Sequence, residues 1–184
     1  MLKRRRLIGL GLGLAFAADG VKAFSQSPEG AGQSEPRAID LHNLHTGEIL
    51  QATYWDAGRY VPDALAAVNK VLRDFRTGDE HMMDPGLLDV LWAVRGKVDS
   101  RRPFQVISGY RSPKTNALLH ERSGGVASNS LHMKGMAIDV RVEGVPLDHL
   151  HKAAINLGRG GVGYYPTSNF VHMDVGRVRR WNGA

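Results

Sequence analysis

The sequence contains no cysteine among its 184 residues. This absence excludes disulfide bonds, a thiolate nucleophile, cysteine-ligated zinc or iron–sulfur centres, and a lipid anchor on a cysteine. Histidine and carboxylate side chains are therefore the strong metal ligands that this chain can offer. The rest of the composition, with 42% hydrophobic and 23% charged residues, is that of an ordinary globular domain.

The sequence also lacks the broadly distributed positive charge of a nucleic-acid-binding domain. The formal net charge is +6, from 24 Lys and Arg residues against 18 Asp and Glu. Five of the basic residues and one acidic residue lie in the first 23 positions, so the remainder has 19 basic and 17 acidic residues and a net charge of only +2. We therefore expect no nucleic-acid partner.

No hydrophobic run is long enough to cross a bilayer comfortably, but the N-terminus has the pattern of an export signal. Met1–Arg6 is positively charged, and Leu7–Ala18 is apolar. The arginines before Leu7 resemble a twin-arginine signal, and small residues offer cleavage sites up to Ala23. We predict a signal peptide over residues 1–23, a periplasmic location and no membrane span after cleavage. A general secretory signal and an uncleaved anchor are the alternatives.

Residues 24–37 are rich in Ser, Gly, Gln, Pro and Glu and predict a flexible linker, which leaves residues 38–184 as one domain. Apolar spacing predicts four helices, the first of them running from Pro62 to about Phe75. The other three helices are predicted over Pro85–Val98, Pro113–Arg122 and Pro146–Leu157. Strands are predicted over Ile39–Leu44, Glu48–Trp55, Phe104–Ile107, Met136–Val142, Val162–Tyr165 and Phe170–Val175. This order favours an α+β fold with a mostly antiparallel central sheet and helices packed on it.

Two short segments combine histidine with aspartate. His132 lies in a loop, and Gly135 permits a sharp turn before Asp139 on the next strand. Further along, two-residue alternation puts His172 and Asp174 on one face of a strand. A catalytic zinc site takes three protein ligands, commonly His and carboxylate. His132, Asp139 and His172 supply that set if the two strands pair; two separate buried polar pairs are the alternative.

The pattern Ser-x-His-x-x-Gly-x-Ala-x-Asp, followed about thirty residues later by a strand histidine, resembles a known superfamily of zinc peptidases. It unites lysostaphin, the D-Ala-D-Ala metallopeptidases and the hedgehog signalling domain. Ser108–Ser112 is similar to the D-Ala-D-Ala branch. With Thr46–Glu48 and Val171–Gly176, the chain more closely resembles the periplasmic murein endopeptidases that carry twin-arginine signals. The resemblance extends over Ile39–Trp181 and implies a hedgehog-like, D-Ala-D-Ala metallopeptidase-like fold.

The resemblance implies one Zn²⁺ ion per chain and hydrolysis of peptide bonds in peptidoglycan. In such enzymes zinc lowers the pKa of a bound water to about 7 and polarises the scissile carbonyl. The resemblance also implies that Arg111 pairs with a substrate carboxylate or the developing oxyanion, for which its planar fork is suited. Tyr110 and Ser130, inside the matching motifs, are the other predicted substrate-binding residues.

The chain departs from its relatives just before His172. Similar peptidases carry a Glu or His two or three residues before the last ligand, whereas this chain has Phe170 and Asn169. We therefore predict that Asp174 acts as the general base, because it leaves the strand on the same face, about 6–7 Å from His172. Alternatively, Asp174 accepts a hydrogen bond from the outer nitrogen of a ligand imidazole, or is a plain surface acid.

The leading prediction is thus a zinc-dependent murein endopeptidase that cuts peptide crosslinks. A D,D-carboxypeptidase or dipeptidase that trims stem peptides is one alternative. A non-catalytic peptidoglycan-binding module is the other, because the missing acid leaves catalysis open. The crosslink type, 4-3 or 3-3, and the oligomeric state are not predicted.

Overall fold

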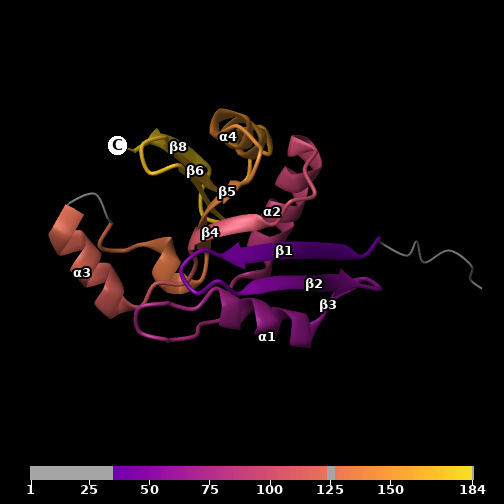
Figure 1. The fold of residues 1–184 in the computed structure, drawn as a ribbon, viewed down its shortest axis with the longest axis horizontal. Helices are drawn as coiled ribbons and strands as arrows, with labels where there is room; N and C mark the ends of the chain where they lie inside the picture. Colours follow the sequence, from indigo (N-terminus) through magenta and orange to yellow (C-terminus); the bar gives the residue numbers. More distant parts are fainter. Residues whose placement is uncertain (1–34, 124–126, 184) are drawn as a thin grey trace, which may run out of the picture. The chain divides into compact units, whose positions relative to one another are not determined.

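The computed structural model describes residues 35–123 and 127–183, which form one sheet with surrounding helices (Figure 1). The predicted signal peptide lies outside these residues. The strands are β1 (Arg37–Asn43), β2 (Ile49–Asp56), β3 (Arg59–Tyr60), β4 (Phe104–Ser108), β5 (Ala137–Val142), β6 (Gly161–Tyr165), β7 (Phe170–Asp174) and β8 (Arg179–Asn182). The helices are α1 (Pro62–Val71), α2 (Pro85–Val98), α3 (Pro113–Ser123), the single 3-10 turn η1 (Leu131–Lys134) and α4 (Leu147–Asn156).

The eight strands make one mixed sheet in the order β3-β2-β1-β4-β5-β7-β6-β8. Five neighbouring pairs are antiparallel, and the pairs β1–β4 and β6–β8 are parallel. The predicted α+β class with a mostly antiparallel sheet is therefore confirmed. The strands that carry the two His/Asp motifs, β5 and β7, are direct neighbours near the middle of the sheet.

The hydrophobic core lies on the face of the sheet that α4 covers. The strands β5 and β7 contribute alternate residues to it, among them Ile138, Val140, Val171 and Met173. Helix α4 adds Leu150, Ala153 and Ala154, and α2, which packs against α4, adds Leu87, Leu88, Leu91 and Val94. Because side chains alternate along a strand, the residues between these apolar positions face the other side. Asp139, His172 and Asp174 therefore share the face opposite α4.

Helix α2 agrees with its sequence prediction at both ends. Asp84 precedes Pro85, and its side chain accepts a hydrogen bond from the Gly86 amide at 2.8 Å. This N-cap satisfies one of the free amides of the first turn, which is why the helix begins there. The helix ends at Val98, where Asp99 adopts a left-handed conformation.

Helix α1 is shorter than predicted, because it ends at Val71 instead of Phe75. The Asp74 carboxylate is buried and accepts hydrogen bonds from the Ser112 amide at 2.9 Å and the Ser112 hydroxyl at 2.7 Å. These bonds hold the chain in an irregular path, and Phe75 stacks on His45 with ring centroids 3.7 Å apart. A buried carboxylate needs such partners, so a tertiary requirement overrides the helical pattern.

Two strands and the η1 turn were not predicted from the sequence. The strands β3 and β8 are short and contain charged residues, so they carry no alternating apolar signal. At the start of the domain, β1 begins at Arg37, the last residue of the predicted linker. Within the described residues, no helix is long and apolar enough to cross a membrane.

Candidate metal centre

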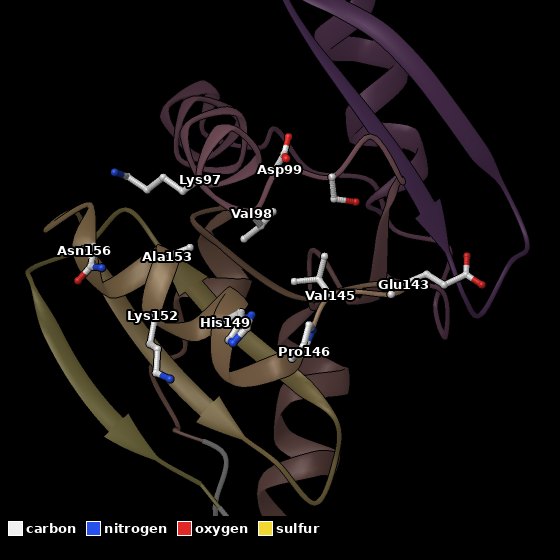
Figure 2. A pocket seen from close by; sticks show the side chains of 12 residues that line it. Lys97, Val98, Asp99, Glu143, Val145, Pro146, His149, Lys152, Ala153 and Asn156 are labelled. Carbon is white, nitrogen blue, oxygen red and sulfur yellow. The ribbon is translucent and has the colours of Figure 1, made fainter.

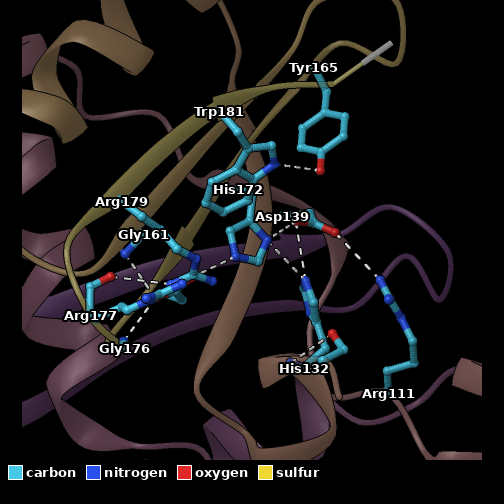
Figure 3. A network of polar contacts seen from close by, with 12 residues as sticks. Arg111, His132, Asp139, Gly161, Tyr165, His172, Gly176, Arg177, Arg179 and Trp181 are labelled. Atoms are coloured by element: carbon cyan, nitrogen blue, oxygen red, sulfur yellow. Dashed lines mark hydrogen bonds and ion pairs between the residues drawn. The ribbon is translucent and has the colours of Figure 1, made fainter. Parts of the chain in front are cut away.

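Three buried side chains from η1, β5 and β7 meet at one point (Figure 3). Asp139 lies opposite His172 in the antiparallel register of β5 and β7, and the His172 Nδ1 atom is 2.9 Å from Asp139 Oδ1. The His132 Nε2 atom is 3.3 Å from Asp139 Oδ1 and 3.2 Å from His172 Nδ1. Among the residues described, no other group of three His, Asp or Glu side chains is arranged to hold a metal ion.

The spacing of these atoms suits a tetrahedral metal ion. Nitrogen and oxygen ligands about 2.0–2.2 Å from zinc lie roughly 3.3–3.6 Å from one another. The three observed separations are within a few tenths of an ångström of that range. The predicted convergence of His132, Asp139 and His172 is therefore confirmed as a candidate metal site.

The chain reverses sharply after η1, which returns Asp139 to the side of His132. The Ser130 hydroxyl caps η1 by accepting the His132 amide at 3.3 Å. Gly135 has φ +66°, and a Cβ there would lie 2.1 Å from the Met82 carbonyl oxygen. Only glycine fits this close approach in a left-handed conformation.

Hydrogen bonds away from the cluster select which nitrogen of each histidine faces it. The His132 Nδ1 atom donates to the Gly109 carbonyl at 2.8 Å, which leaves Nε2 directed at Asp139. In His172 the roles are reversed, because Nε2 donates to Asp174 Oδ2 at 3.1 Å and Nδ1 faces Asp139. Ligand histidines in metalloproteins are commonly oriented by partners of this kind.

The Asp174 carboxylate is fully buried, and all its partners are donors. Its Oδ1 atom accepts the Gly161 and Gly176 amides, both at 2.8 Å, and an Arg179 nitrogen at 3.2 Å. Its Oδ2 atom accepts His172 and the second Arg179 nitrogen, the latter at 2.7 Å. Both oxygens are thus engaged by the protein itself.

The imidazole of His172 lies between the carboxylates of Asp139 and Asp174. Burial would lower the pKa of His172, but hydrogen bonds to Asp139 and Asp174 outweigh it and raise the pKa to about 9. Burial would raise the pKa of Asp139, but His132 and His172 hold it well below its usual range. The pKa of Asp174 is likewise low, because the hydrogen bonds from His172, Gly161 and Gly176 outweigh burial. A divalent cation binds here only when the His172 nitrogen that faces Asp139 carries no proton.

Two glycines on β6 let residues of β8 reach the cluster, a feature that sequence reasoning missed. Gly161 pairs with Arg179, and Gly163 lies between His172 on β7 and Trp181 on β8. A Cβ on Gly161 would be 2.6 Å from Arg179 Nη1, and one on Gly163 would be 2.5 Å from the Trp181 ring. Arg179 therefore extends across β6 to Asp174, and Trp181 extends toward His172, with ring centroids 5.1 Å apart. The glycine-dense stretch before Tyr164 was the sequence signal that could have indicated this crossing.

Gly160 allows β6 to begin directly against Asp174. Gly160 has φ +62°, and a Cβ there would lie only 1.6 Å from the Asp174 carbonyl oxygen, whereas Gly158 has φ +64° and open space around it. We expect Gly160→Ala to lower the free energy of unfolding by about 2–5 kcal/mol, from left-handed strain plus steric overlap. The matched control Gly158→Ala should lose only about 1–2 kcal/mol, from the strain alone. Urea unfolding measures both, and equal losses would contradict the close approach.

The cluster lies at the wall of a cavity of about 550 Å³. Arg111 and Ser130, both predicted to bind substrate, line it, whereas Tyr110 is not among its lining residues. Tyr110 instead stacks on His81, with ring centroids 4.7 Å apart, and its amide donates to the Leu72 carbonyl at 2.7 Å. The structure thus brings Arg111 and Ser130 to the cavity beside the cluster and leaves Tyr110 outside the cavity lining.

Arg111 is nearly buried, with 11% of its side chain exposed. One guanidinium nitrogen is 3.7 Å from Asp139 Oδ2 and 3.3 Å from the Ser108 hydroxyl, while Nε is buried without a hydrogen-bond partner. Burial lowers the pKa of Arg111, and Asp139 partly compensates. Because the guanidinium lines the cavity, its charge and its terminal nitrogens can bind an oxygen that enters there.

Neither position that holds an acid or histidine in similar peptidases offers one here. Phe170 stacks on Tyr165 with ring centroids 4.5 Å apart, and both line the cavity. Asn169 lies in the turn before β7 with φ +54°. The described residues that line the cavity include no carboxylate besides Asp139.

A second cavity, of about 610 Å³, lies between the end of α2 and the start of α4 (Figure 2). Its charged side chains include Lys97, Asp99, Glu143 and Lys152, which stand apart around the opening. Among the described residues that line it, no set of His, Asp or Glu side chains converges as a metal site would.

Known proteins match this chain over nearly its whole length. The protein family described as "Peptidoglycan L,D-endopeptidase MepK" matches residues 31–181. The chain is 46% identical over 180 residues to peptidoglycan L,D-endopeptidase MepK of Escherichia coli K12, covering 97% of this chain and 96% of that protein. It is 41% identical over 177 residues to the probable peptidoglycan L,D-endopeptidase MepK of Haemophilus influenzae, covering 96% and 92%.

Proposed function

The chain belongs to the MepK family of peptidoglycan L,D-endopeptidases, and from this premise we propose that it hydrolyses L,D peptide crosslinks of the cell wall with a zinc ion at His132, Asp139 and His172. The observation that carries the proposal is the convergence of these three ligands at the wall of a cavity. Family membership makes it an endopeptidase of the cell envelope and favours crosslinks over free stem ends or mere binding. The L,D designation points to 3-3 crosslinks instead of 4-3.

The donor set supports zinc as the resident metal. Two imidazole nitrogens and one carboxylate oxygen are a common ligand set of catalytic zinc sites, and the sequence has no cysteine to compete. When bound, zinc supplies a water of lowered pKa and polarises the scissile carbonyl. One ion per chain follows from one such cluster among the described residues.

Around that centre, the protein's own residues bind and orient the substrate. Arg111 offers its terminal guanidinium nitrogens to a carbonyl or carboxylate oxygen, where its fixed charge stabilises developing negative charge. Ser130 caps η1 and so holds His132 in place at the edge of the cavity. Tyr110 stacks on His81 and does not line the cavity, so we propose no contact between Tyr110 and the substrate.

The contacts of Asp174 favour the second of its predicted roles, the orientation of His172, over that of general base. The His172 ring lies between Asp174 and the cluster, because its Nε2 faces Asp174 and its Nδ1 faces Asp139. Every oxygen of Asp174 already accepts donors from the protein, and none of the residue is exposed. A base has to reach the proton that it abstracts. We therefore assign Asp174 to fixing the tautomer of His172.

This assignment predicts the effect of Asp174→Asn. The asparagine side chain has one acceptor oxygen where aspartate has two, so it cannot accept hydrogen bonds at both positions. His172 then loses its fixed orientation, and zinc affinity is expected to fall about 10–100-fold. A competition titration with a chelator measures the affinity. A general base would instead show unchanged affinity with kcat lower by about 10²–10⁴. Asp148→Asn, at a partly exposed carboxylate paired with Lys152 on α4, is the matched control and should behave like the unmodified protein.

Digestion of intact sacculi and of purified crosslinked dimers tests the function itself. We expect the protein to convert L,D-crosslinked dimers to monomers, to leave D,D-crosslinked dimers intact, and to lose activity with a chelator. Mass spectrometry of the products identifies the bond. Release of a terminal amino acid without dimer cleavage would support the carboxypeptidase alternative and contradict the proposal.

The N-terminus supports export to the periplasm. Residues 1–23 combine paired arginines with a short apolar segment, the pattern of a twin-arginine signal. A substrate in the cell wall requires this location. Replacing the arginines by lysine and following the protein in periplasmic fractions tests the route.

A further inference from the structure

The cavity presents neutral and cationic donors to the substrate, and Asp139 is the one carboxylate among its described lining residues. Apart from the three proposed ligands, its described lining includes Arg111, Arg179, Tyr165 and Trp181. Arg179 is already bound to Asp174 through two nitrogens. Arg111 and Tyr165 are therefore the strongest candidates to hydrogen-bond a substrate oxygen.

The Tyr165 hydroxyl has an unused proton. Its oxygen accepts the indole N–H of Trp181 at 2.8 Å. An indole nitrogen can only donate, so this bond uses a lone pair of the phenol and leaves its O–H free. Within the described residues that O–H meets no acceptor. Figure 3 shows the hydroxyl beside Trp181, on the side of the cluster where Asp139 lies.

The Tyr165 ring and its partner Trp181 are both fixed in place. Tyr165 stacks on Phe170 with an interplanar angle of 19°. Trp181 lies over Gly163, against His172, and under the Arg179 guanidinium, whose carbon is 4.9 Å from the ring centroid. A donor held this way loses little conformational freedom when a substrate arrives.

We propose that Tyr165 is a catalytic residue that donates a hydrogen bond to the carbonyl oxygen of the scissile peptide, and that Trp181 is the positioning residue that aims its hydroxyl. The phenol acts with Arg111, which lines the same cavity. The substrate group is a backbone peptide carbonyl whose oxygen gains negative charge during attack. This inference rests on the proposed endopeptidase function.

The first test is Tyr165→Phe, which removes the hydroxyl and keeps the stacked ring. A hydrogen bond to a charged oxygen predicts a loss of about 10–100-fold in kcat with KM nearly unchanged. The substrate is the purified L,D-crosslinked dimer, and bound zinc is measured on the same samples. Tyr164→Phe is the matched control, because the neighbouring Tyr164 stacks on His151 from α4; it should keep full activity.

The second test separates the two roles with a double-mutant cycle. Trp181→Phe should lower kcat by less than Tyr165→Phe, and the double variant should lose no more than Tyr165→Phe alone. Losses that multiply would show that Trp181 acts independently and would overturn its positioning role. If Trp181→Phe does not fold, the result for Tyr165→Phe still decides the catalytic role.

The outcomes distinguish this inference from the proposed function. If the unmodified protein cleaves the dimer and Tyr165→Phe cleaves it equally well, the inference fails and the function stands. A loss that appears entirely in KM would also overturn it, because the hydroxyl would then bind the ground state only. If the unmodified protein cleaves neither dimer, the proposed function fails and the inference fails with it.

Discussion

Replacing His132 or His172 by alanine is expected to abolish metal binding and hydrolysis together. Each variant removes one of three ligands from a buried cluster whose atoms lie 2.9–3.3 Å apart. Two remaining ligands do not complete a catalytic zinc site. Because a catalytic metal lowers the activation barrier by several kcal/mol, the loss in kcat/KM should be at least about 10³-fold.

The measurement combines metal analysis of the purified variants with dimer cleavage and far-UV circular dichroism. His149→Ala is the matched control, since His149 is an exposed histidine on α4 that lines the other cavity. It should retain one zinc ion and full activity. A folded His132 or His172 variant that still binds one zinc ion per chain would contradict the ligand assignment.

Arg111→Lys is expected to lower kcat/KM by about 10²–10³, or 2.7–4 kcal/mol in the barrier, which is typical of a lost oxyanion donor. The guanidinium is nearly buried beside Asp139, with Nε unpaired. Lysine keeps the charge, but its single ammonium cannot reproduce the planar fork. The loss in kcat/KM should therefore come from the missing planar fork, since the charge itself is kept.

Steady-state kinetics on the L,D-crosslinked dimer measure this loss, and zinc content is determined in parallel because Arg111 lies 3.7 Å from a ligand oxygen. Arg101→Lys, at an exposed arginine before β4, is the control and should be neutral. Unchanged kcat/KM in Arg111→Lys would make Arg111 a structural residue that supports the Ser108 turn.

Local sequence patterns were sufficient to predict much of this protein's structure. Two-residue alternation predicted that His172 and Asp174 share one strand face, and the helix predicted over Pro85–Val98 has these bounds in the structure. Periodicity and capping depend on residues a few positions apart, so they are readable from the sequence. The metal-site prediction used the motif around His132 and Asp139. The turn and the start of the next strand, which this motif combines, are also features of neighbouring residues.

The tertiary structure decided which distant residues lie beside the candidate site and which donors surround Asp174. The register of β6 with β8 places Arg179 and Trp181 beside Asp174 and His172, across glycines that leave the space open. Strand pairing of this kind joins residues that no local period connects, and the polar strand β8 has no apolar signal. The role of Asp174 likewise depends on backbone amides and an arginine that occupy both its oxygens. Sequence by itself determined the residue types of the candidate ligands and the strand faces of Asp139 and His172, whereas only packing determined which of their atoms remain free for chemistry.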